Sequence, residues 1–214
     1  GMDAELAAAT YNLGLVQAEA GDVAQAVANL AEAADAFKVL GAGREASAAS
    51  LERAAVLVGA GHYELAVTAL EAQLTATEEA GDEAARGRLM NALGLARLGT
   101  GEPGEAVKAF QEALAANPRT IRPDGFAMAK ANLALAYEAL GDRARARLAA
   151  SQAECVPGIA PPIAAQARGV LVRLGHNSDD LLTVLLTEPA DRWVAVVREE
   201  VLRWLALDTG ARTA

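Results

Sequence analysis

The sequence is poor in the residues that support disulfide, metal and aromatic chemistry. Its 214 residues include one cysteine, Cys155, which can form no intramolecular disulfide and supplies no pair of metal-binding thiolates. Aromatic residues make up 4% of the chain, although 53% of it is hydrophobic, and alanine supplies the largest share. Such a composition favours helices that pack closely together. Seven prolines and nineteen glycines are too few for a disordered or collagen-like chain.

Basic residues are also in the minority. The chain has 19 lysines and arginines against 28 acidic residues, which gives a net charge of −9. Nucleic-acid phosphates and anionic lipids repel such a chain unless its basic residues cluster strongly. The clusters are small: Arg119 with Arg122, and Arg143, Arg145 and Arg147, which alternate along a predicted helix. We therefore expect neither a nucleic acid nor a membrane as a partner.

Long apolar runs are missing. No stretch approaches the ~18 uncharged apolar residues of a membrane-spanning helix, and no basic start followed by an apolar core marks a signal peptide. We interpret Gly1 before Met2 as a cloning remnant. These features and the single cysteine predict a cytoplasmic protein, and the bias towards alanine, arginine and valine indicates a bacterial source.

Catalytic and metal-binding patterns are missing as well. His62 and His176 stand beside turn glycines, where a polar capping role suffices, and neither has a cysteine or carboxylate at metal-ligand spacing. Cys155 has no paired histidine evident in the sequence. We predict that the protein is not an enzyme and that it carries no cofactor and no metal.

What the sequence does contain is an internal repeat. Glycines recur every 40 residues, each before a polar residue that can start a helix: Gly21, Gly61, Gly101 and Gly141. Five residues after each glycine stands an alanine: Ala26, Ala66, Ala106 and Ala146. Nine residues after stand Leu30, Leu70, Phe110 and Ala150, and seven before stand Gly14, Ala54, Gly94 and Ala134. Small residues on both helices of a unit allow an antiparallel pair to pack at close range and to stack on the next pair.

These units resemble the tetratricopeptide repeat family. The third unit resembles it most fully, through Leu93-Gly94, Gly101, Ala106, Phe110, Ala113 and Pro118. The period of 40 exceeds the usual ~34 residues, and Arg53 stands where a leucine is expected. The resemblance implies an all-α fold, a right-handed α-solenoid of antiparallel helix pairs. We expect one continuous domain with four pairs in residues 3–156, at about 3–40, 43–80, 82–118 and 124–156, followed by capping helices over 157–208.

The C-terminal region departs from the repeat. After Cys155 the register fails, and three prolines and a glycine interrupt residues 156–162. The last predicted helix, near 190–207, carries both tryptophans. One of its faces holds Trp193, Val197, Val201 and Trp204. That face either caps the apolar end of the solenoid or forms a dimer or partner surface.

The resemblance also implies that the first helix of each pair lines a concave groove. The candidate binding residues there are mostly apolar, with a few polar positions: Tyr11, Asn12, Leu15, Leu51, Val58, Arg88, Asn91, Leu95, Leu98, Met128, Asn132, Leu135 and Glu138. The polar residues are too few to favour the carboxylate clamp of some family members. An apolar groove suits an amphipathic helix or an extended apolar peptide, unless a tighter superhelix turns the same strip into core.

These features predict a protein–protein interaction scaffold that binds an unidentified protein or peptide through the groove. Two alternatives stay open. The tryptophan-bearing helix could make the protein a self-associating module and a homodimer, or the repeats could form a small-ligand sensor or regulatory accessory protein.

Overall fold

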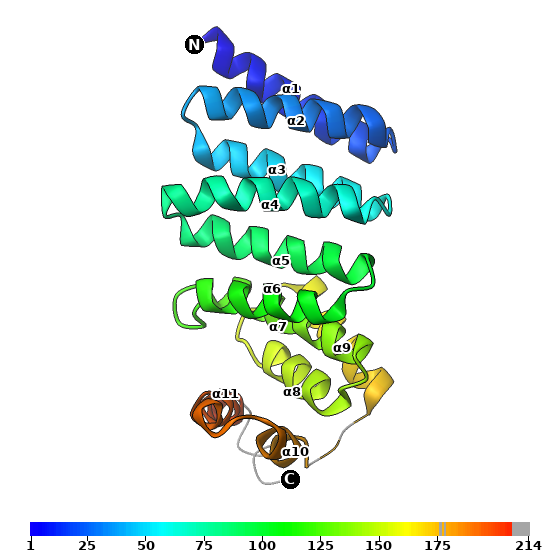
Figure 1. Ribbon diagram of the computed structural model, residues 1–214, viewed down its shortest axis with the longest axis vertical. Coiled ribbons are helices and arrows are strands. Elements are labelled where there is room, and N and C mark those ends of the chain that lie inside the picture. The colour runs from blue at the N-terminus through cyan, green and yellow to red at the C-terminus, as the bar shows by residue number, and fades with distance from the viewer. Residues whose placement is uncertain (176, 178, 207–214) are drawn as a thin grey trace. The chain divides into compact units, whose positions relative to one another are not determined.

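The chain folds into helices throughout the part that the structure describes. The computed structural model describes residues 1–175, 177 and 179–206, so His176, Ser178 and the end of the last predicted helix lie outside the described residues. All regular secondary structure in the described part is helical, and consecutive helices of the repeats run antiparallel (Figure 1). The predicted all-α class is confirmed.

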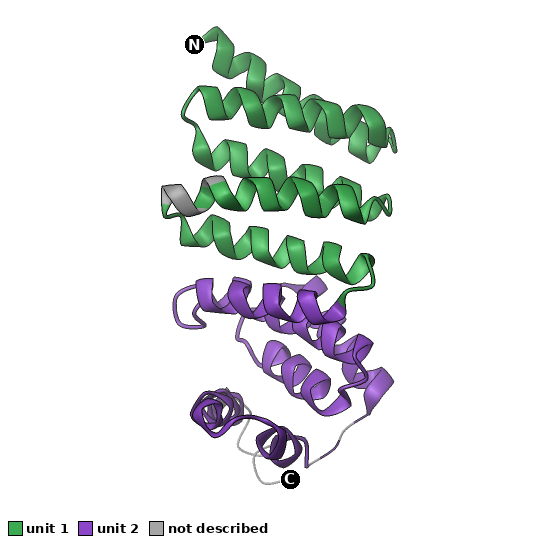
Figure 2. Cartoon of the chain, in the orientation of Figure 1, with its two compact units in different colours: residues 1–102 green, residues 103–214 purple. Residues whose placement is uncertain are grey.

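The helices form two compact units, residues 1–102 and 103–214 (Figure 2). The first unit contains α1 (Met2–Glu19), α2 (Val23–Val39), α3 (Gly43–Gly59), α4 (Tyr63–Ala80) and α5 (Glu83–Gly99). The second contains α6 (Pro103–Ala116), α7 (Pro123–Ala139), α8 (Arg143–Glu154), α9 (Pro161–Leu174), α10 (Asp180–Thr187), the 3₁₀ turn η1 (Ala190–Arg192) and α11 (Trp193–Ala206). The single continuous domain, its boundaries and the right-handed superhelix stay predictions.

The marker glycines end helices through one recurring hydrogen-bond pattern. Gly21 has a positive φ of 81°. Its N–H donates to the carbonyl of Ala18, and the N–H of Asp22 donates to the carbonyl of Gln17, at 3.1 and 2.9 Å. This is a Schellman motif, which needs a residue that tolerates a left-handed backbone. The Asp22 carboxylate then accepts a hydrogen bond from the N–H of Gln25, so one tight turn ends α1 and starts α2.

The sequence also contains markers that the 40-residue register overlooked. Gly41 and Gly81 stand halfway between the marker glycines and also have positive φ values, 71° and 67°. They end the second helix of a pair, whereas the marker glycines end the first. The unit that repeats at the level of backbone turns is therefore a single helix of about 20 residues in the first three pairs.

Each helix in the first unit packs against its neighbours along the chain, and α3 also contacts α1 and α5. Close approach depends on small residues. A Cβ added to Gly14 on α1 would lie 2.8 Å from Cγ of Leu30 on α2, which is fully buried. Between α2 and α3, Phe37 packs against Ala46 and Ala49. Alanine at these positions keeps the helices close enough to exclude water with few large side chains.

The second unit begins in the same way and ends differently. Helices α6 to α9 pack sequentially and α7 also contacts α9, while α10 and α11 both pack against α8. The core between α7, α8 and α9 consists of alanines around Val170 and Leu171. Among the described helices, none has both the length and the apolar character needed to cross a membrane.

Candidate interaction surfaces

The predicted groove positions of the first unit form a half-exposed apolar strip. They lie on α1, α3 and α5, the first helices of the pairs, and α3 contacts both of the others. We define the first-helix face as the half-buried apolar side chains at these positions: Tyr11, Leu15, Leu51, Val58, Leu95 and Leu98. Burial, and secondarily the nearby carboxylate of Glu52 on α3, raise the pKa of Tyr11. The strip is therefore continuous between α1 and α3.

The polar groove positions of the first unit divide into two kinds. Asn12 and Arg88 are exposed, whereas Asn91 is buried, with 7% of its surface accessible. A site that holds a terminal carboxylate needs several convergent donors from cationic and amide side chains. Only Arg88 among these residues offers an accessible cation, so the surface is suited to apolar contacts with one charged edge.

In the second unit, three of the four predicted groove residues contribute to internal packing. Asn132 is buried, and its Oδ1 accepts a hydrogen bond of 2.6 Å from Gln166 on α9. Glu138 accepts two hydrogen bonds, of 2.8 and 2.7 Å, from Arg173 on the same helix, and these bonds lower the pKa of Glu138. Leu135 packs against the alanine core. The sequence did not indicate this role because α9 lies beyond the end of the 40-residue register.

The fourth predicted residue of this set, Met128, stays half-buried on α7. The candidate binding strip of the second unit is therefore much smaller than that of the first. A partner that binds the first helices finds its apolar contacts chiefly on α1, α3 and α5.

The predicted apolar face of the last helix is exposed. We define the tryptophan face as Trp193, Val197, Val201 and Trp204, whose surfaces are 45%, 40%, 51% and 59% accessible. The opposite side of α11 faces the rest of the unit through Glu200, which is 4% accessible and accepts a hydrogen bond of 2.9 Å from Gln152 on α8. In the described residues the apolar side of this helix thus covers no apolar core, unlike the face of a cap.

Charged groups also hold the underside of α11. Arg119 lies 3.7 Å from Glu199 in an ion pair, and the cationic groups of Arg119 and Lys130 lie 5.7 and 5.5 Å from the centre of the Phe126 ring. Burial lowers the pKa of Lys130, and the carboxylates of Glu199 and Glu200 oppose that shift. These contacts leave the apolar side of α11 free to meet a partner.

The position of the tryptophan face leads to a prediction. Replacing Trp204 with aspartate should leave the melting temperature within a few degrees of the wild type, because an exposed substitution away from buried features changes stability by about 0.5 kcal/mol or less. Thermal denaturation followed by circular dichroism measures this. A collapse of the folded state would show that the face acts as a cap in solution.

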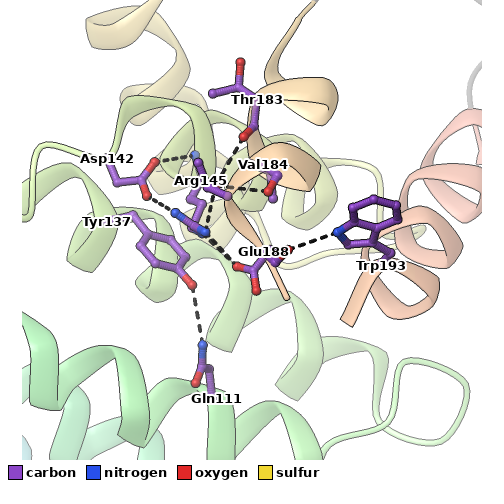
Figure 3. Close-up of polar contacts among 9 residues, drawn as sticks. Gln111, Tyr137, Asp142, Arg145, Thr183, Val184, Glu188 and Trp193 are labelled. Atoms are coloured by element: carbon purple, nitrogen blue, oxygen red, sulfur yellow. Dashed lines mark hydrogen bonds and ion pairs between the residues drawn. The ribbon is translucent and has the colours of Figure 1, made fainter. Parts of the chain in front are cut away.

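A polar network joins α10 and α11 to α8 (Figure 3). Arg145 donates hydrogen bonds to Glu188 at 2.9 Å and to Thr187 at 3.0 Å, and it pairs with Asp142. Trp193 donates from its indole nitrogen to the carbonyl of Glu188, at 3.0 Å. Burial opposes the charge of Arg145, but its hydrogen bonds to Asp142 and Glu188 raise its pKa overall. The network is suited to fixing the helices in place, because its charges neutralise one another.

A cavity of about 170 Å³ lies beside this network, lined by residues of α7, α8, α10 and α11. Tyr137 contributes to its wall, and burial is the main cause that raises the pKa of this phenol. Burial also raises the pKa of the Cys155 thiol, which disfavours the nucleophilic thiolate at neutral pH. Among the described residues, no group of three or more histidines, cysteines and carboxylates is placed to hold a metal ion.

Antiparallel helices that stack in sequence, with small residues at every contact, define this chain as an α-helical repeat protein. Residues 87–120 match the family model described as tetratricopeptide repeat. The recognised family is therefore confirmed: the protein carries a tetratricopeptide repeat in the unit that the sequence singled out. The 40-residue variety stays a prediction, and no curated protein matches the chain. Stacked repeats of this kind typically form extended binding surfaces for proteins or peptides, and typically act as scaffolds without catalysis.

Proposed function

We propose that the protein is an interaction scaffold that binds an amphipathic helix or an extended apolar peptide of a partner through the first-helix face. The observation that carries the proposal is the partial exposure of that face. Leu51, Leu95 and Leu98 are half-buried, whereas Leu89, on the same helix as the last two, is fully buried. A strip that served only as core would be closed like Leu89.

The chemistry of the face indicates the kind of partner. Its central side chains are aliphatic, and Arg88 and Glu52 supply exposed charges of both signs. Apolar anchors repeated along one side of a peptide, with polar residues around them, would match this pattern. The acidic net charge of the chain favours a partner that carries some basic residues.

The test measures binding of an environment-sensitive apolar dye to the full chain and to the variant Leu95→Glu. Removing a leucine contact of about 1.5–3 kcal/mol should weaken dye binding roughly tenfold or more. Leu65→Glu is the matched control, because Leu65 is 60% exposed on α4 of the same unit and lies outside the first-helix face. Equal loss in both variants, or no dye binding by the wild type, would contradict the proposal.

A second candidate is binding or self-association through the tryptophan face. Exposed tryptophans are favoured centres of interfaces, and the two in this chain are its only tryptophans. Their indole fluorescence offers a direct measurement, since burial against a partner shifts the emission to shorter wavelengths. An emission that does not change with protein concentration would exclude self-association through this face.

A further inference from the structure

The outer side of α1 carries an apolar stripe that no described residue covers. We define the α1 stripe as Met2, Leu6, Ala9, Leu13 and Val16, which follow one another at steps of four, three, four and three residues. This spacing places them on one face of the helix, in the pattern of a coiled-coil seam. Met2, Leu6, Leu13 and Val16 are 85%, 67%, 50% and 61% exposed. An apolar stripe this long is unusual on an outer helix surface that only meets water.

The same positions are covered in the later repeats. One repeat after Leu6 and Ala9 stand Ala46 and Ala49, which are 2% and 0% exposed. The preceding helix, α2, covers them with Ala33 and Phe37. Ala9 itself is exposed.

The third and fourth repeats show the same contrast. Leu89 and Ala129, at the register position of Ala9, are fully buried, and Phe126 and Leu133, at those of Leu6 and Leu13, are 5% and 4% exposed. The preceding helices α4 and α6 pack against α5 and α7 respectively. The repeat architecture therefore places a helix at the position that is open beside α1.

The geometry of the stack sets the direction of that missing helix. The helix before each first helix is joined to it by a tight turn and runs antiparallel to it (Figure 1). The open position beside α1 thus calls for an antiparallel helix. A twofold axis perpendicular to α1 supplies one, because it places a second copy of α1 antiparallel to the first.

We propose that a second copy of this chain covers the α1 stripe, so that two protomers pair through antiparallel α1 helices about a twofold axis at Ala9. Ala9 then lies opposite the partner's Ala9, where its small side chain permits close approach. Met2 lies opposite the partner's Val16, and Leu6 lies beside the partner's Leu13. Every residue of the stripe meets an apolar residue of the same stripe.

The charges around the stripe agree with this arrangement. The polar residues that flank Ala9 at the axis, Thr10 and Asn12, are uncharged, so like charges do not oppose each other there. Glu19 ends α1 and would lie beside the first turn of the partner's α1. A carboxylate is favourable at the positive end of a helix dipole.

Sedimentation velocity on the full chain tests the proposal. We expect a dimer for the wild type, and a monomer with unchanged helix content for Leu6→Glu combined with Leu13→Glu. Losing two leucine contacts on each protomer should weaken association by a hundredfold or more, on the order of that given by a loss of about 3 kcal/mol. The matched control combines Val201→Glu and Trp204→Glu on the tryptophan face and should stay dimeric.

Disulfide cross-linking tests the geometry, in chains whose own thiol has been removed by Cys155→Ser. Ala9→Cys should form a cross-linked dimer, and a mixture of Met2→Cys and Val16→Cys chains should cross-link to each other. Cross-linking through Ala9→Cys alone would indicate a parallel pair and overturn the proposal.

Two other results would also overturn it. One is a dimer that only the tryptophan-face variant disrupts. The other is a monomeric wild type, which would leave the stripe to a helix of a different protein. Binding of a peptide with the α2 sequence, residues 23–39, to the monomer would then assign that class of partner.

Discussion

Replacing Phe110 with alanine is expected to lower the free energy of unfolding by about 3–5 kcal/mol, the largest effect among single substitutions considered for this chain. Phe110 lies on α6 inside the matched repeat, and its side chain is fully buried. Its removal would lose the transfer of a whole aromatic ring from water and leave a cavity. The alanine-rich neighbours have few flexible side chains with which to fill that cavity.

Urea denaturation followed by circular dichroism measures this loss. Phe110→Leu keeps most of the apolar volume and should cost about 1.5 kcal/mol or less. The surface control Lys108→Ala, on an exposed side chain of the same helix, should change stability by about 0.5 kcal/mol or less. A Phe110→Ala variant as stable as the Lys108→Ala variant would show that the α6 core is not packed as described.

Replacing Asp180 with alanine is expected to cost about 3 kcal/mol and to release α10 from α8. Asp180 starts α10 and accepts two hydrogen bonds, of 2.7 and 2.6 Å, from Arg147 on α8. Each side chain is 11% exposed. Removing one partner of a covered ion pair leaves an unpaired buried charge, whose cost is about 3–5 kcal/mol. The lower figure applies because both side chains retain some contact with water.

A double-mutant cycle separates the ion pair from other effects. Replacing both residues by apolar ones of similar size, Arg147→Met with Asp180→Leu, should restore much of the stability, because no unpaired charge remains. Hydrogen exchange on the full chain should show faster exchange in residues 180–206 for Asp180→Ala and little change in α1 to α5. Asp191→Ala, on an exposed acidic residue of the same region, is the control. Additive effects of the two single substitutions would contradict the assigned pairing.

The repeat signal was strong in sequence because its causes are local. A residue with positive φ after a helix is nearly always glycine, and the aspartates after Gly21 and Gly141 cap the helices that follow. Helix bounds could therefore be placed to within a few residues. The half-period glycines Gly41 and Gly81 carry the same signal, and a search at 20 residues as well as at 40 would have found them.

The candidate surfaces were less predictable because exposure depends on contacts between helices that are distant in sequence. Asn132 and Glu138 have the register of groove residues, but α9 engages them through Gln166 and Arg173. No repeat pattern extends to α9, so nothing in the local sequence indicated these pairs. The open stripe on α1 shows the converse, since its apolar residues match buried positions of later repeats and differ only in lacking a helix on top.

The sequence by itself determined the class of this protein, an all-helical tetratricopeptide-type repeat, and the composition of the last helix, with four apolar residues on one side. It did not determine which side of that helix faces inward. An amphipathic pattern has two sides, and in most domains the apolar one is buried. Here tertiary structure decided otherwise, because Gln152, Arg119 and Arg203 provide polar partners for Glu199 and Glu200 on the inner side of α11. The physical reason is that paired charges can be buried between helices, which leaves Trp193 and Trp204 exposed for a partner to cover.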